Sequence, residues 1–210
     1  MKILYFDLFL GVSAQSIFSA LYDIINTPSL NVKADKYDVS GILCTNAQPL
    51  EDNLFSQDDF LFAKNVCKNI LRDEKEDTKF FCAINHLLKI LSPDFIISSP
   101  IYDGSVFDVK TNMCIPSPNV LKMFKDLKIP YESLKIQKQL AKEDGIAVIK
   151  SVSNDFGTLP KLDIDKIGYG TDGDTITRVV TGYEKQDSLC DIFEISEEIA
   201  NIREISYLTK

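Results

Sequence analysis

Three residues near the N-terminus have types and spacing that suit ligand binding: Asp7, Gly11 and Ser13. Asp7 lies near the end of the apolar run Lys2–Phe9, and Ser13 precedes a segment with the apolar spacing of a helix. Where a strand leads into a helix through a short Gly/Ser turn, backbone N–H groups point outward at the carboxyl end of the strand, and α/β proteins build their sites there.

A carboxylate beside such N–H groups can hold a metal cation or a ribose hydroxyl, and the N–H groups of residues 11–13 can receive a phosphate. We therefore predict ligand binding at Asp7, Gly11 and Ser13, with Asp7 as the metal-ligand candidate. The alternative is a capping interaction that carries no chemistry.

The segment Gly168–Gly173 matches the glycine pattern of dinucleotide-binding loops, G-x-G-x-x-G. Such a loop must open a helix, whose N-terminus holds the pyrophosphate. Here the following residues, DTITRVV, favour a strand, and Asp172 and Asp174 would repel a phosphate. We therefore predict a connection between two strands; an unrelated nucleotide-binding enzyme that uses this loop is an alternative.

Cys82 and His86 have the i, i+4 spacing that lets two side chains on one helix share a metal ion. Lys79 and Lys89 fall on the same face, and their charges oppose a cation, so we expect a solvated helix face. His86 is the only histidine, which argues against serine-type triads and sites with several histidines. The five cysteines include no C-x-x-C pair and indicate reduced thiols.

The composition is that of a globular protein, with 210 residues of which 45% are hydrophobic and 26% charged. The net charge of −8 argues against binding to nucleic acid or to an anionic membrane surface. The apolar runs are shorter than a membrane-spanning helix, and Asp7 interrupts the first of them too early for a signal peptide. We expect a cytoplasmic protein.

Strand-like and helix-like segments alternate along the chain and then give way to strands, which predicts an α/β fold. Its mixed sheet has helices packed on it and a strand-rich C-terminal third. The predicted helices are residues 14–25, two within 60–91, 119–127 and 142–153. The predicted strands are residues 2–9, 39–44, 93–104 with a hairpin turn at Asp103-Gly104, 131–135, 161–170, 174–183 and 189–196. Residues 45–59 are predicted as an acidic surface loop.

Four segments, taken in order, resemble the N-terminal domain of the LarC nickel-insertion family: YFDLFLGVSAQSIFSALYD, INHLLKILSPDFIISSPIYDG, IPSPNVLKMFKDLKIP and DFGTLPKLDIDKIGYGTDGDTITRVVTG. The residues that carry the resemblance are Asp7, Phe9, Gly11, Ser13, Ser99, Pro100, Gly104, Pro116, Pro118, Leu121, Lys122, Gly157, Pro160, Gly168, Tyr169, Gly170 and Arg178.

The resemblance implies a cyclometallase of the lyase class that places nickel into a pyridinium bisthiocarboxylic acid mononucleotide, with CTP consumed. It implies a LarC-type N-terminal α/β domain at residues 1–186. Residues 187–210 resemble the start of the family's second domain, which the resemblance associates with the nucleotide. Activity is then expected to need a separate nucleotide-binding domain or a protein partner that carries it.

The chain departs from the family pattern at several polar positions. Ala14-Gln15 replaces Gly-Asp, Lys142–Gly145 replaces a T-P-T-G signature, and the family's histidine-rich stretch has no counterpart. Our first hypothesis is a divergent LarC-type protein that handles nickel, the mononucleotide or both, near Asp7, Gly11 and Ser13. The second is a non-catalytic interaction protein that kept the fold and lost the metal-binding residues.

Overall fold

The computed structural model describes residues 1–25, 27, 30–50, 55–71, 78–108 and 113–185. The helices are α1 (Ala14–Ile25), α2 (Gln57–Asn65), the π-helical segment η1 (Val66–Leu71), α3 (Lys79–Leu91), α4 (Pro118–Leu127) and α5 (Glu143–Val152). The strands are β1 (Lys2–Asp7), β2 (Val32–Val39), β3 (Ile42–Pro49), β4 (Phe95–Ser98), β5 (Ile101–Gly104), β6 (Phe107–Asp108), β7 (Met113–Cys114), β8 (Tyr131–Leu134), β9 (Asp155–Phe156), β10 (Leu162–Thr171) and β11 (Ile176–Glu184).

Seven strands form one mixed sheet in the order β2-β3-β10-β11-β1-β4-β9. β1 pairs in parallel with β4 and antiparallel with β11, and β11 pairs antiparallel with β10. The α/β class, the mixed sheet and the strand-rich C-terminal third are therefore confirmed. The strand predicted at residues 189–196 and the extension 187–210 lie outside the described residues.

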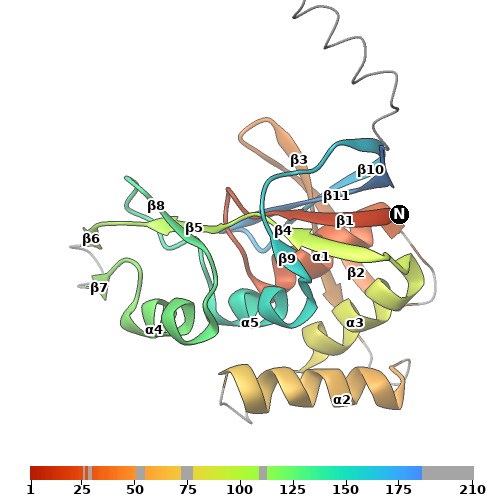
Figure 1. The fold of residues 1–210 in the computed structure, drawn as a ribbon, viewed down its shortest axis with the longest axis horizontal. Helices are drawn as coiled ribbons and strands as arrows, with labels where there is room; N and C mark the ends of the chain where they lie inside the picture. Colours follow the sequence, from red (N-terminus) through yellow and green to blue (C-terminus); the bar gives the residue numbers. More distant parts are fainter. Residues whose placement is uncertain (26, 28–29, 51–54, 72–77, 109–112, 186–210) are drawn as a thin grey trace, which may run out of the picture.

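The helices gather on one side of the sheet, with α1 against the strands and α2 outermost (Figure 1). α1 packs on β10, β3 and β11, while α3 packs on α1. Ser13 begins α1 as predicted, because its Oγ accepts a hydrogen bond from the Ser16 N–H at 3.0 Å. Within the described residues, no helix covers the opposite face of the sheet (Figure 1).

The two glycines of Gly168-Tyr169-Gly170 make room for α1 on β10. A Cβ atom at Gly170 would lie 2.1 Å from the backbone N of Ala20 and 2.2 Å from the carbonyl oxygen of Ser16. A Cβ atom at Gly168 would lie 2.5 Å from the carbonyl oxygen of Ala20. The glycine-rich segment therefore serves helix–sheet packing, and the predicted connection between two strands is confirmed by the antiparallel pairing of β10 with β11.

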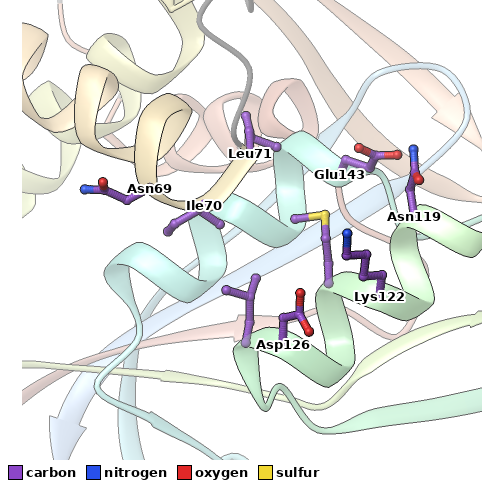
Figure 2. Close-up of a pocket in the computed structure, with 9 residues that line it drawn as sticks. Asn69, Ile70, Leu71, Asn119, Lys122, Asp126 and Glu143 are labelled. Carbon is purple, nitrogen blue, oxygen red and sulfur yellow. The ribbon is translucent and has the colours of Figure 1, made fainter.

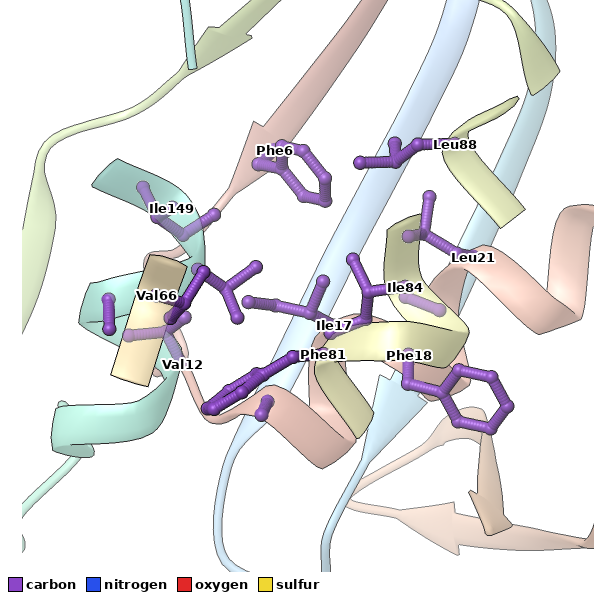
Figure 3. Close-up of a cluster of buried hydrophobic side chains, with 14 of the residues drawn as sticks. Phe6, Val12, Ile17, Phe18, Leu21, Val66, Phe81, Ile84, Leu88 and Ile149 are labelled. Atoms are coloured by element: carbon purple, nitrogen blue, oxygen red, sulfur yellow. The ribbon is translucent and has the colours of Figure 1, made fainter. Parts of the chain in front are cut away.

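The core fills the space between the sheet and the helices (Figure 3). Phe6 from β1, Ile17 and Phe18 from α1, and Phe81 and Ile84 from α3 are all fully or almost fully buried in it. Cys82 is also fully buried, so the expectation of a solvated helix face at this position is wrong. The reason is that α3 lies between α1 and α2 and is covered on two sides.

Three predicted elements differ in the structure. Residues 39–44 are not one strand: Ser40 and Gly41 both have positive φ angles and form the tight turn between β2 and β3. The predicted acidic loop 45–59 holds the rest of β3 and the start of α2, and residues 51–54 lie outside the described part. The expected hairpin at Asp103-Gly104 is wrong as well, because β5 leaves the main sheet and pairs in parallel with β8.

Asp103 explains why the chain does not turn there. Its side chain is fully buried and accepts hydrogen bonds from the backbone N–H of Leu140 at 2.6 Å and of Gly104 at 2.8 Å. Burial raises the pKa of this carboxyl group, although these N–H donors act in the opposite direction. Asp103 therefore ties β5 to the segment before α5, and that segment in turn contacts the turn after β1.

Candidate functional site

Asp7, Arg178 and Tyr169 form a row across three neighbouring strands. Asp7 at the end of β1 lies opposite Arg178 on β11, and Arg178 lies opposite Tyr169 on β10. Directly opposed residues of antiparallel strands project to the same face. Because Gly168 and Gly170 face α1, Tyr169 between them faces the other way, and the row lies on the helix-free face.

Asp7 and Arg178 form an ion pair in which Nη2 of the guanidinium donates to Oδ2 of the carboxylate. The other carboxylate oxygen, Oδ1, accepts a hydrogen bond from the backbone N–H of Phe9 at 3.2 Å. Burial disfavours the charge of Arg178, but the contacts with Tyr169 and Asp7 outweigh it and raise the pKa of the guanidinium. Arg178 is thus charged at neutral pH.

Tyr5 and Tyr102, near Asp7, keep their protons because burial and nearby negative charge raise the pKa values of their phenols. Burial is the main cause that raises the pKa of the Tyr5 phenol, and the negative charge of Asp7 adds to it. Burial also raises the pKa of Tyr102, where Glu132 and Asp7 contribute. These phenols remain neutral hydrogen-bonding groups beside the ion pair.

The row opens into a pocket of about 210 Å³. Its lining residues are Asp7, Phe9, Leu10, Ile42, Tyr169, Ile176 and Arg178. Phe9 and Leu10, from the turn after β1, are 50% and 41% exposed and place apolar surface at the rim. The pocket therefore combines a cation, an anion and two aromatic rings with aliphatic walls.

Gly11 shapes the turn that carries this pocket's rim. Its φ angle is +111°, and a Cβ atom there would lie 2.8 Å from the carbonyl oxygen of Leu140. The N–H of Gly11 donates to the Leu8 carbonyl at 3.0 Å, and the N–H of Val12 donates to the Leu140 carbonyl at 2.9 Å. A phosphate bound to these N–H groups would have to replace the hydrogen bonds that they already make. The geometry therefore favours a role for Gly11 in forming the turn rather than in binding a phosphate.

Ser13 lies in a different pocket from Asp7. That pocket, of about 240 Å³, is lined by Ser13, Ala14, Gln15, Phe80, Phe81, Lys142, Asp144 and Asp172. The backbone N–H of Ser13 donates to Ser16 Oγ at 2.9 Å, which completes a reciprocal cap of α1. The structure therefore separates two residues that the sequence placed in one site.

Charged side chains in the Ser13 pocket satisfy one another. Burial alone would raise the pKa of Asp172, but hydrogen bonds from Lys142, Ser13 and the backbone of Thr175 and Asp174 lower it to about 2. The Lys142 ammonium lies 2.8 Å from the Asp172 carboxylate. Burial raises the pKa of Asp144, and the charge of Asp172 adds to that effect. This cluster holds the first residues of α1 close to those of α5, because the Asp144 carboxylate accepts a hydrogen bond from the Ala14 N–H.

His86 interacts with a buried carboxylate. Its Nδ1 atom lies 3.6 Å from Oδ2 of Asp59. In the same carboxylate, Oδ2 accepts a hydrogen bond from the Ser56 hydroxyl and Oδ1 accepts one from the Asn85 amide. Among the residues the structure describes, no three His, Cys, Asp or Glu side chains lie together as a metal site would require. Cys82 is fully buried in the core, and His86 lies beside Asp59.

A further pocket of about 250 Å³ lies between η1, α4 and the first residue of α5 (Figure 2). Asn69, Ile70 and Leu71 come from η1, and Lys122 and Asp126 come from α4 (Figure 2). It contains none of the predicted site residues. Its polar side chains come from η1, from α4 and from Glu143, and it contains neither Asp7 nor Arg178.

Arg178 and Tyr169 are the site residues that the sequence reasoning missed. Both were noted, but only as matches to a family pattern. The pairing of β1 with β11 would have identified Arg178, because it places this residue opposite Asp7 although the two are 171 residues apart in sequence.

In the part of the chain that the structure describes, none of the helices has the length and apolar character required to cross a membrane. A family model described as "Nickel insertion protein" matches residues 81–189. No solved structure matches the chain.

Two curated relatives carry the same description, "Pyridinium-3,5-bisthiocarboxylic acid mononucleotide nickel insertion protein". The protein of Acetivibrio thermocellus is 26% identical over 229 residues, covering 81% of this chain and 56% of its own length. The protein of Geobacillus kaustophilus is 31% identical over 121 residues, covering 53% of this chain and 29% of its own length. The chain thus spans little more than half the length of the Acetivibrio thermocellus protein.

Proposed function

Because this chain belongs to the nickel insertion protein family, we propose that it takes part in the insertion of nickel into a pyridinium-3,5-bisthiocarboxylic acid mononucleotide. Its part is to bind the organic substrate on the helix-free face of the sheet. The observation that supports this assignment most directly is the pocket in which Asp7 and Arg178 present opposite charges side by side.

The chemistry of that substrate matches the pocket. A pyridinium ring is a flat cation, and its thiocarboxylate and phosphate groups are anions. A guanidinium binds planar acid groups through paired N–H donors, and a carboxylate stabilises a nearby cation. When the substrate binds, Arg178 can exchange part of its contact with Asp7 for an acid group while Asp7 faces the ring.

Nickel is a substrate of this reaction, and Asp7 is assigned to its organic partner. One carboxylate oxygen does not make a nickel site, because nickel favours imidazole, thiolate or several carboxylate ligands. The described residues bring no three such groups together. Gly11 and Ser13 are assigned to the shape of the turn and the cap of α1, respectively.

Calorimetric titration of the mononucleotide tests the proposal. The wild-type protein should bind it, Arg178→Gln and Asp7→Asn should each weaken binding at least tenfold, and Asp163→Asn, which changes an exposed carboxylate on β10, should bind as the wild type does. Absence of heat with the wild-type protein would contradict the proposal and favour the interaction-protein hypothesis.

A further inference from the structure

We propose that the Asp7–Arg178 pocket is a subsite for the ring of the ligand alone, and that it recognises a cationic aromatic ring with acid substituents without requiring sulfur. This inference rests on the proposed function and states which end of the substrate enters. It adds that the ribose and phosphate remain outside the pocket, and that the oxygen analogue of the ring binds as well as the sulfur compound.

The size of the pocket selects the ring. Its volume is about 210 Å³. A cavity of about 150 Å³ accommodates benzene, whereas pockets for drug-sized ligands begin at about 300 Å³. A single six-membered ring with two small substituents falls between these limits, and a complete mononucleotide exceeds them. The part of the substrate that the pocket can enclose is therefore one ring.

The charges of the pocket select a ring that carries both signs. The Asp7 and Arg178 side chains are 17% and 46% exposed, so a ligand can reach both. A neutral ring would leave the ion pair unchanged and gain only apolar contact. A ring with one positive and one or two negative groups can pair with both residues at once and thereby replace the contact it disrupts.

The walls of the pocket favour a cationic aromatic ring. Phe9 and Tyr169 supply two aromatic side chains, and the negative face of such a ring attracts a cation placed over it. Phe9 is held in place by an edge-to-face contact with Tyr102 at 5.1 Å between ring centres. Leu10, Ile42 and Ile176 cover the remaining surface with aliphatic groups.

The lining residues also indicate that the pocket does not distinguish a thiocarboxylate group from a carboxylate group. The described residues around the pocket include neither cysteine nor methionine, and its one cation is a guanidinium. A guanidinium recognises the planar shape and charge of an acid group, which carboxylate and thiocarboxylate share. The pocket is therefore expected to hold the ring by charge and shape and to leave discrimination between oxygen and sulfur to other groups.

NMR titration with small rings tests this inference. The probes are N-methylpyridinium-3,5-dicarboxylate, benzene-1,3-dicarboxylate, which lacks the ring charge, and N-methylpyridinium, which lacks the acid groups. With wild-type protein, the first probe should shift the amide signals around Asp7, Tyr169 and Arg178 and bind at least fivefold more tightly than either of the others.

Variants at two positions make the test specific. Asp7→Asn should abolish the preference for the charged ring over benzene-1,3-dicarboxylate while that dicarboxylate still binds. Arg178→Gln should weaken both dicarboxylates at least tenfold, and Arg178→Lys should recover part of the loss. Unfolding temperatures of all variants show whether they fold.

Equal affinity of the wild type for charged and uncharged rings would overturn the inference, as would an unchanged preference in Asp7→Asn. If the complete mononucleotide binds and the dicarboxylate ring does not, the subsite is wrong and the proposed function stands. If neither ligand binds, the proposed function itself is wrong.

Discussion

Asp7 and Arg178 are 171 residues apart in the sequence and directly opposite each other in the sheet, where the carboxylate accepts a hydrogen bond from the guanidinium. The pair lies at the mouth of a pocket on the face that the described helices leave uncovered. Position and charge together make these two residues the centre of the proposed binding site.

Arg178 is predicted to matter for binding far more than for folding. A partly exposed ion pair contributes no more than about 1 kcal/mol to stability. Arg178→Gln should therefore lower the free energy of unfolding by less than about 1 kcal/mol, while it weakens binding of the mononucleotide at least tenfold. Urea unfolding and calorimetry measure the two effects, and a large loss of stability with unchanged binding would assign Arg178 to the fold.

Gly170 is predicted to be indispensable for the packing of α1 on β10. A Cβ atom there would lie 2.1 Å from the backbone of Ala20, so helix and strand must move apart. Gly170→Ala should lower the free energy of unfolding by about 2 to 3 kcal/mol. The matched control is Gly157→Ala, because a Cβ atom at Gly157 meets nothing within 4 Å. Equal stability of the two variants would show that the close contact is absent.

Ser13 is predicted to act through the cap of α1. Its Oγ accepts from the Ser16 N–H at 3.0 Å, and it lies outside the Asp7 pocket. Ser13→Ala should cost about 1 kcal/mol of stability and leave mononucleotide affinity within twofold of the wild type. Thermal unfolding and calorimetry provide the two readouts. A tenfold loss of mononucleotide affinity in Ser13→Ala would show that Ser13 is part of the binding site.

Asp172 is predicted to make stability depend on pH in the acid range. Its pKa is lowered from 3.8 to about 2 in the folded protein. The stabilisation that it provides is thus complete above pH 3.8 and is lost as the pH falls toward 2. Between pH 4 and pH 2, Asp172→Asn should lose less free energy of unfolding than the wild type. Equal slopes for variant and wild type would contradict the lowered pKa.

Local pattern predicted much of the fold. β1, α1, α4 and α5 each follow from apolar spacing with a Ser, Pro or Gly near an end. The turn at Ser40-Gly41 was missed because the segment 39–44 was interpreted as one apolar run, although the Ser-Gly pair is itself a turn signal. Both residues have positive φ angles in the structure. The parallel pairing of β5 with β8 was missed because it depends on contacts distant in sequence, including the buried bonds of Asp103.

The candidate site was predicted in part for the same reason. The strand, the glycine turn and the serine cap are local features, and Asp7 was found through them. Its counter-charge was missed because Arg178 reaches Asp7 only through the order of strands in the sheet. Ser13 was placed in the same site because the two residues are close in sequence, whereas the turn at Gly11 directs them to different pockets.

The location of the bound mononucleotide is the most direct test of the binding site. Amide signals of the protein, followed by NMR during a titration, should shift around Asp7, Phe9, Tyr169 and Arg178, with those of Ser13, Lys142 and Asp144 unchanged. Shifts that appear only around Ser13 and Lys142, or none at saturating ligand, would contradict the account.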